Sequence, residues 1–305
     1  MHTVERSRVA ARVLLLFLAA ATPEVAAQVP QNAAPLSFEA LAVFATRRLR
    51  ESSGVAVSRS HPGVLWTHND SGDGAYVYAT NLQGEDLGRF TVRGARAADW
   101  EDLALGPCPS AAASCLYIAD TGDNGERRKA VALYVVPEPD PAQPRPTKPA
   151  HRIAITYREG PVDVEGVAVT PGGTVLLVSK GRSGPVVLFR IPADSVAADS
   201  LSLAPWATLP ITPQRRLGRL VTGAAVSPDG RTLAVRTYTE VYFLGIDREA
   251  ESVHLRTSCW LGLREPQGEA VDFLDDSTLV LTSEAALGRS GGVARLRCRM
   301  GTPAP

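Results

Sequence analysis

The chain has 305 residues, of which 45% are hydrophobic and 21% charged, and its 32 basic and 32 acidic side chains give a formal net charge of zero. This composition is that of a globular protein with a sizeable core. Because no basic tract stands out, it argues against nucleic acid and anionic membranes as partners.

The N-terminus has the pattern of a signal peptide. Several arginines precede the apolar run Val13–Ala21, which is too short to span a bilayer, and small residues before Gln28 offer a cleavage site. We expect a signal peptide over residues 1–27, a flexible leader over 28–36 and a single domain over 37–305. The mature protein is then exported to the periplasm or the extracellular space. A membrane anchor is the alternative interpretation of the apolar run.

The remainder of the chain has the pattern of short strands separated by Gly, Pro, Asn and Asp. Segments rich in Val, Leu, Tyr and Phe lie at 64–70, 75–80, 115–120, 131–137, 174–180, 186–192, 232–238, 241–246 and 278–284. The Pro-rich segment 137–149 is predicted to be an extended surface loop. Segment 201–209 is ambiguous, and its prolines favour a loop.

A five-residue phrase recurs with a period of roughly fifty residues, each copy followed by a turn and an apolar run. It reads SGVAV, EDLAL, EGVAV, TGAAV and, loosely, EAVDF, starting at Ser53, Glu101, Glu165, Thr222 and Glu269. This repeat predicts an all-β fold, a β-propeller of five four-stranded blades. We expect the segment Leu41–Leu49 to complete the last blade and close the ring. Six blades and a β-sandwich are the alternatives.

The four cysteines suit an oxidising compartment. Cys108 and Cys115 flank a short loop and are expected to form a local disulfide. Cys259 and Cys298 would then pair and tie two late strands, and four free buried thiols are the alternative.

Polar residues stand beside every copy of the phrase. In an antiparallel blade the start of the first strand and the end of the second lie at the same end, so these residues are predicted to ring one mouth of the central channel. The candidate ligand-binding residues are Asn69, Asp70, Asp73, Asp99, Glu165, Lys180, Arg236, Glu269 and Glu284. The candidate metal ligands are Glu101, Asp102, Asp120, Asp123 and Asn124.

Carboxylates held this close repel one another and raise each other's pKa. Oxygen ligands suit calcium or another hard divalent cation, and too few histidines are present for a zinc site. Pairing with lysine or arginine, or protonation of one acid for catalysis, would also relieve the repulsion. The sequence does not identify a catalytic residue, but Glu101 and His68 are the candidates for this role. Trp100 is expected to pack between blades.

The segments SGVAV…NDSGD, DWEDLA…YIADTGDN and VEGVAV…LLVSK together resemble secreted bacterial propellers related to the esterase-like phytase group. That resemblance implies a propeller fold, export, calcium and phosphoester chemistry. In outline the chain is also similar to the gluconolactonase and regucalcin group, whose propeller holds one divalent metal. This second resemblance places Glu101 or Glu165, Asn69 or Asn124, and Asp120 in the role of metal ligands.

The sequence thus predicts an exported, monomeric propeller that binds a divalent cation and a small molecule or peptide at an acidic mouth. Two alternatives stay open. One is a metal-assisted hydrolase of a phosphoester or lactone. The other is a metal-free interaction platform whose acids are satisfied by Lys180 and the arginines.

Overall fold

The computed structural model describes residues 34–70, 72–143, 146–211, 218, 220–247 and 251–300. The expected signal peptide and most of the leader lie outside these residues. Among the residues described, none forms a helix of the length and hydropathy needed to cross a membrane.

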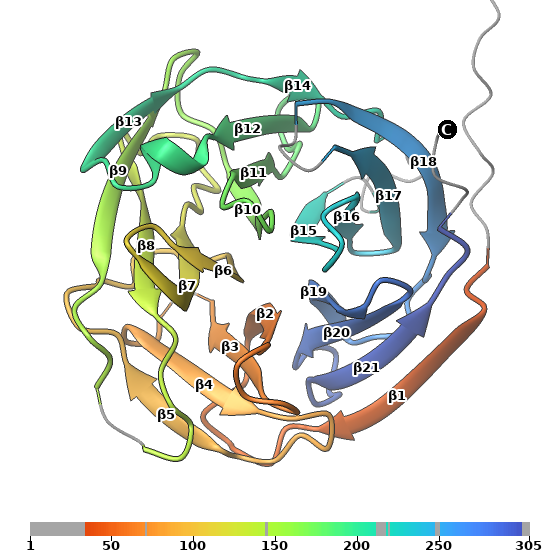
Figure 1. Ribbon diagram of the computed structural model, residues 1–305. Coiled ribbons are helices and arrows are strands. Elements are labelled where there is room, and N and C mark those ends of the chain that lie inside the picture. The colour runs from red at the N-terminus through yellow and green to blue at the C-terminus, as the bar shows by residue number, and fades with distance from the viewer. Residues whose placement is uncertain are drawn as a thin grey trace, which may run out of the picture.

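The strands form a ring of five sheets, which are the five blades of a β-propeller (Figure 1). Blade 1 contains β2 (Ser52–Val57), β3 (Leu65–Asn69), β4 (Tyr76–Thr80) and β5 (Gly88–Thr91). Blade 2 contains β6 (Asp102–Cys108), β7 (Ala111–Asp120), β8 (Val131–Pro137) and β9 (His151–Tyr157). Blade 3 contains β10 (Val164–Val169), β11 (Val175–Ser179), β12 (Val187–Ile191) and β14 (Ala207–Thr208).

The last two blades follow the same plan. Blade 4 contains β15 (Val221–Val226), β16 (Thr232–Thr237), β17 (Glu240–Ile246) and β18 (Val253–Trp260). Blade 5 contains β19 (Gln267–Asp275), β20 (Thr278–Glu284), β21 (Gly292–Arg297) and β1 (Ser37–Val43). The repeated phrases lie in or next to β2, β6, β10, β15 and β19, which surround the central axis in Figure 1. The predicted fold and blade number are therefore confirmed.

The ring closes through β1, which pairs antiparallel with β21 from Ser37 opposite Arg297 to Val43 opposite Gly292. Closure by an N-terminal strand is as expected, but the strand begins and ends earlier than the predicted segment. Residues 44–51 instead form the connection from β1 to β2. Phe44 and Leu49 of this connection are buried in the core, so its sequence has apolar residues like those of a strand.

The described core consists of five apolar clusters, each between two neighbouring blades. Trp100 belongs to the cluster between blades 1 and 2, is 1% exposed, and donates from its indole nitrogen to the carbonyl oxygen of Arg96. Its expected packing role is confirmed. Because each blade packs on both neighbours, the ring holds the ends of its five inner strands at fixed positions.

Both predicted disulfides are present, Cys108–Cys115 and Cys259–Cys298. The second joins β18 of blade 4 to the residue after β21 of blade 5. Segment 201–209 is not wholly a loop. It contributes to β13 (Ser200–Leu203), which runs parallel to β9, and contains β14, the outer strand of blade 3.

Candidate functional site

A β-bulge marks the repeated phrase in several blades. The register between β10 and β11 shifts between Val164 and Gly166, so Glu165 has no residue opposite it. Equivalent shifts leave Thr222 of β15 and Glu269 of β19 without a cross-strand partner. A bulge re-aims the side chain of its extra residue. In blades 3, 4 and 5 the phrase therefore encodes, besides a strand, a bulge that redirects one side chain.

The glycine after the bulge is required by close packing of the inner strands. A Cβ atom on Gly223 would lie 2.9 Å from the carbonyl oxygen of Glu269, and one on Gly166 would lie 2.9 Å from the Cβ of Ala224. Inner strands this close bring the bulged residues of neighbouring blades to one mouth of the channel.

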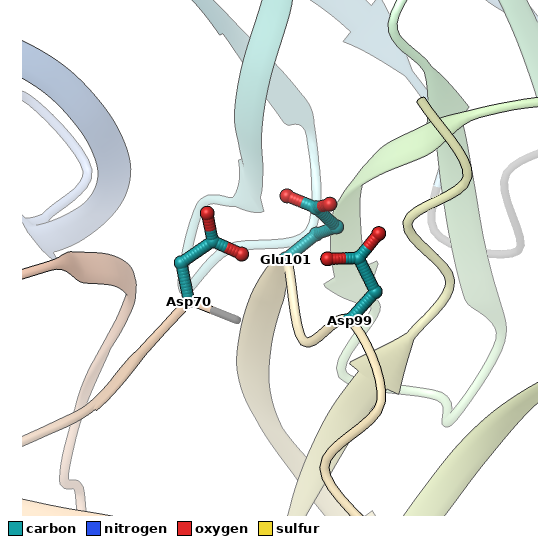
Figure 2. Close-up of side chains that lie close together, drawn as sticks. All are labelled: Asp70, Asp99 and Glu101. Atoms are coloured by element: carbon teal, nitrogen blue, oxygen red, sulfur yellow. The ribbon is translucent and has the colours of Figure 1, made fainter. Parts of the chain in front are cut away.

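A first group of three carboxylates lies where blades 1 and 2 meet. Asp70 follows β3, Asp99 lies in the loop before β6, and Glu101 immediately precedes β6. One oxygen from each residue lies within 4.8 Å of the other two. Figure 2 shows the three side chains grouped at the ends of their segments, with Glu101 between Asp70 and Asp99. We call Asp70, Asp99 and Glu101 the first carboxylate cluster.

A second group shares one member with the first. Glu101, Asp163 and Glu165 are all buried and also bring one oxygen each within 4.8 Å of the others. This second carboxylate cluster contains cations of the protein itself: Lys180 Nζ lies 2.5 Å from Glu165 Oε1, and Arg182 Nε lies 3.4 Å from Asp163 Oδ2. Glu101 therefore connects a cluster with internal cations to the first cluster.

The electrostatics of the first cluster favour bound positive charge. Burial and the nearby charge of Asp70 raise the pKa of Asp99 to about 6. Burial, Glu165 and Asp70 raise the pKa of Glu101 well above its usual value. In Asp99 and Glu101 the anion is disfavoured by lost hydration and by acidic neighbours, which Arg128 and Lys180 offset only in part, and a divalent cation would offset them further.

Blade 5 adds a pair of acids bridged by an amide. Gln267 Nε2 donates to Glu269 Oε1 and to Glu284 Oε2, both at 2.7 Å. Burial and the charge of Asp70 raise the pKa of Glu284 to about 7, and burial and Glu284 raise that of Glu269 well above its usual value. The influence of Asp70 on Glu284 indicates that the acids of blades 1 and 5 face the same mouth.

Sequence reasoning missed Gln267 and also Tyr238, which lies between β16 and β17. Burial raises the pKa of Tyr238 strongly, and the charges of Glu269 and Glu165 raise it further. Tyr238 therefore stands among the ring acids. Its signal was present in the sequence, because it immediately follows the second strand of blade 4, where the other blades place polar ring residues.

Asp102, a candidate metal ligand, lies outside both clusters. It is fully buried, and its Oδ2 accepts hydrogen bonds from the backbone nitrogens of Val167 at 3.0 Å and Ala224 at 3.1 Å. Its Oδ1 accepts from the nitrogen of Leu103. Adjacent strand residues point to opposite sides, so Glu101 and Asp102 have different surroundings. Asp102 links the inner strands of blades 2, 3 and 4.

The candidates in DTGDN are also outside the two clusters. Asp120 pairs with Arg128 at 3.0 Å, and Asp123 accepts from the backbone nitrogens of Arg127 and Arg128. Asn124 accepts a hydrogen bond from Arg182. These contacts order the β7–β8 loop beside the mouth.

Asn69 and Asp73 stabilise the loops of blade 1. The Asn69 side chain accepts from the backbone nitrogens of Arg50 and Glu51 and donates to Asp73 Oδ2 at 2.7 Å. Asp73 also accepts from the hydroxyl of Tyr78. Both residues thus have local partners that hold the chain around Asp70.

His68 does not lie at the mouth, contrary to the expectation that made it a catalytic candidate. It is fully buried between blades 1 and 2, with its ring perpendicular to Trp100 at a centroid distance of 5.6 Å. Burial lowers its pKa to about 4. It is therefore neutral at pH 7 and a packing residue in this structure.

Arg236 also has a structural environment. It is fully buried, donates to the carbonyl oxygens of Ala270 at 2.6 Å and Thr282 at 3.1 Å, and forms an ion pair with Glu265. These contacts fasten blade 4 to blade 5. Arg236 is a predicted ligand-binding residue, but both of its Nη atoms already donate hydrogen bonds to groups of the protein.

The fold and this mouth define the chain as a five-bladed propeller with an acidic axial site. No family model matches the chain, and no curated protein matches its sequence. Among solved structures it is similar to the calcium-binding protein regucalcin of Agrobacterium tumefaciens (10% identity, 90% of this chain, 99% of that chain, TM-score 0.45).

Two further solved structures are similar at the same level. One is the PQQ-bound aldose sugar dehydrogenase of Streptomyces coelicolor (14% identity, 87% of this chain, 99% of that chain, TM-score 0.46). The other is the allergen Mala s 1 of Malassezia sympodialis (12% identity, 80% of this chain, 92% of that chain, TM-score 0.48). Likenesses this distant carry no ligand or activity over to the chain, and the resemblance to the esterase-like phytase group stays a prediction.

Proposed function

We propose that this protein is an exported propeller that binds one divalent cation at the first carboxylate cluster and, beside it, a small molecule or peptide. The observation that carries the proposal is the mutual approach of one oxygen each from Asp70, Asp99 and Glu101 to within 4.8 Å. Two oxygens that each lie about 2.3–2.6 Å from one calcium ion are separated by no more than about 5 Å. The spacing of the cluster therefore suits a shared cation.

The donor set favours calcium over transition metals. All three candidate ligands are carboxylates, and oxygen-only donors select hard cations. Asp99 and Glu101 have raised pKa values, so binding a cation would release protons and relieve repulsion. The second carboxylate cluster already contains the ammonium of Lys180, which makes it the poorer site for an external ion.

The rest of the ring would contact the organic ligand. Tyr238, Glu269 and Glu284 face the mouth, and among the described residues the hydroxyl of Thr222 is buried without a hydrogen-bond partner. Thr222 occupies the bulge position that Glu165 and Glu269 occupy in the neighbouring blades. A ligand hydroxyl or amine at this place would satisfy these groups.

Calcium titration by calorimetry tests the proposal, with Glu101→Gln as the decisive variant. The substitution keeps the shape of the side chain and removes the carboxylate shared by both clusters, so we expect at least a tenfold weaker affinity. Asp140→Asn, in an exposed loop, is the matched control and should bind as the wild type does. If neither calcium, magnesium nor manganese binds, and a chelator leaves the melting temperature unchanged, the cation site does not exist.

A second candidate function is metal-assisted hydrolysis, favoured by Glu165. Burial raises the pKa of this carboxylate, and it adjoins Glu101 at the mouth. A carboxylate titrating nearer neutrality is suited to accept a proton from an attacking water. A bound cation would supply polarisation of a substrate oxygen. Phosphoesters and lactones are the substrates to screen. Glu165→Gln should abolish any turnover while calcium still binds, and equal turnover by this variant would exclude Glu165 as the base.

A further inference from the structure

The closing blade exposes apolar side chains at its mouth end. Val43 at the end of β1, Leu263 in the β18–β19 loop and Leu287 in the β20–β21 loop are 59%, 70% and 93% exposed. Over the described residues a fourth large hydrophobic side chain, Leu36, is 61% exposed, but it precedes β1 and lies at the opposite end of that strand. All three lie at the mouth end of one blade, where exposed apolar groups can form part of an interaction surface.

Leu287 is unfavourable for folding in two respects. Ala286 and Arg289 exchange backbone hydrogen bonds of 3.1 and 2.9 Å around a two-residue turn in which Leu287 has φ 54° and Gly288 has φ 74°. Two positive φ values are those of a type I′ turn, whose first position favours Asn, Asp or Gly. A leucine there adopts a disfavoured left-handed conformation and also exposes its side chain to water. The folded chain alone gives no reason for a leucine at this turn position. Contact of its side chain with an apolar partner would offset the cost of the turn conformation and of the exposure to water.

The loops that carry these apolar groups, and the adjoining β1–β2 connection, also carry exposed arginines, one of which, Arg264, places its guanidinium over the ring of Phe38. The loops that carry them are joined: Arg289 Nη2 donates to the carbonyl oxygen of Arg264 at 3.0 Å, and the nitrogen of Ala285 donates to the carbonyl oxygen of Arg50 at 2.9 Å. The exposed arginines of these loops are Arg47, Arg48, Arg50, Arg264 and Arg289. Among the described residues no carboxylate lies within 4.0 Å of any of these guanidinium groups.

We propose that this surface, the blade 5 rim, docks the protein peripherally on a membrane that contains anionic lipids. The blade 5 rim comprises Val43, Leu263, Leu287 and the five arginines named above. Leucines at loop tips enter the boundary between headgroups and acyl chains, and the arginines pair with lipid phosphates. Stable attachment needs two weak signals together, an apolar insertion and a basic patch, and the rim supplies both.

The net charge of the chain conceals this patch. The arginines lie between positions 47 and 289 in the sequence, and only ring closure brings the β1–β2 loop beside the β20–β21 loop. The composition argues against an anionic membrane, whereas the fold brings five exposed arginines together on one rim, where Glu51 is the exposed acid of the described loop residues. Docking through this rim would bring the acidic mouth close to the headgroups.

Co-sedimentation with vesicles tests the proposal. The protein should bind vesicles of equal parts phosphatidylglycerol and phosphatidylcholine, should not bind phosphatidylcholine alone, and should dissociate as salt is raised. Leu287→Asn should lower partitioning roughly tenfold, the loss expected for one buried leucine. Because Asn suits the I′ turn, this variant should melt at or above the wild-type temperature. Arg264→Gln and Arg289→Gln should each lower partitioning roughly fivefold.

Matched controls come from the far parts of the molecule. Leu36→Asn removes an exposed leucine at the other end of β1, and Arg152→Gln removes an exposed arginine of blade 2, so both should bind vesicles as the wild type does. Equal binding to both vesicle types, or unchanged binding by Leu287→Asn, would overturn the proposal. So would self-association that Leu287→Asn abolishes in sedimentation velocity, which would assign the rim to a second copy of the chain.

Discussion

Lys180 Nζ lies 2.5 Å from Glu165 Oε1, and both side chains are almost wholly buried. The pKa of Lys180 is raised by the charge of Glu165, so the lysine stays charged inside the mouth. The protein thus supplies Lys180 and Arg182 as cations to the second carboxylate cluster, whereas the cation proposed for the first cluster would come from solution. Lys180 is present whatever the solution contains, whereas the proposed external cation is present only when the solution supplies it.

Lys180→Met should therefore destabilise the cation-free protein. Removing one partner of a buried ion pair leaves an uncompensated charge and costs about 3–5 kcal/mol. Excess calcium should recover part of this loss, because a second ion can then replace the ammonium. Calorimetric melting in chelator and in calcium measures both effects. The control is Arg295→Met, which breaks the exposed pair with Glu39 and should cost about 0–1 kcal/mol. Equal melting of the two variants would contradict the assignment.

Without a bound cation, the free energy of unfolding should decrease as pH rises from about 4 to 7, because the ring acids ionise over this range. The folded-state pKa of Glu284 is about 7, above its ordinary value of 4.5, so its contribution is complete below pH 4.5 and is lost as pH passes through 7. The difference corresponds to on the order of 3 kcal/mol. Unfolding by urea in chelator at several pH values measures it.

Glu284→Gln isolates this effect from an opposing one. The pKa of His68 is lowered to about 4, so its contribution is lost as pH falls from 6.5 towards 4. The wild-type curve contains both contributions, and the difference between wild type and Glu284→Gln contains the carboxylate alone. Glu85→Gln, in an exposed turn, should follow the wild-type curve. An unchanged pH slope in Glu284→Gln would show that this acid does not titrate as described.

The fold could be predicted because the repeated phrase encodes local geometry. In blades 3 and 4 a glycine follows the bulge because the inner strand packs closely on that of the next blade, and blade 5 has a bulge followed by Ala270. The predicted ring of acids follows from the same alignment of blades. The local sequence was sufficient for these features because equivalent positions recur in every copy of the repeat, so aligning the copies also aligns the blades.

Which carboxylates meet could not be predicted, because that depends on contacts between blades. DWED contains Asp99, Glu101 and Asp102, of which two belong to the first carboxylate cluster and one binds backbone amides of other blades. His68 stands one residue before Asn69, yet it points into the core. Alternation along a strand separates such neighbours, and the sequence does not state which side faces the mouth.

The two disulfides should differ in their contribution to stability. Cys259 and Cys298 are 39 residues apart, whereas Cys108 and Cys115 are 7 apart. In the chain-entropy model the longer loop restricts the unfolded chain more, about 4 kcal/mol against about 2.5 kcal/mol. Replacing Cys259 and Cys298 by alanine should therefore lower the melting temperature more than replacing the other pair. The reverse order, measured by calorimetry, would show that native contacts outweigh loop entropy.

Asp102 provides the sharpest distinction between a structural and a ligating carboxylate. Its two oxygens accept from three backbone nitrogens of blades 2, 3 and 4, so Asp102→Ala leaves three buried amides unsatisfied, at about 1–3 kcal/mol each. We expect a large loss of stability from Asp102→Ala and a smaller one from Asp102→Asn, because the amide keeps one acceptor oxygen.

Calcium affinity should separate Asp102 from Asp99, its neighbour in the same tetrapeptide. Folded Asp102→Asn should bind calcium as tightly as the wild type, because this side chain lies outside both clusters. Asp99→Asn should melt near the wild-type temperature in chelator and bind calcium at least tenfold more weakly. Isothermal titration of both variants at matched pH measures the contrast. If instead Asp102→Asn loses calcium while its unfolding free energy is unchanged, Asp102 is a ligand and the cation lies deeper in the channel than the first carboxylate cluster.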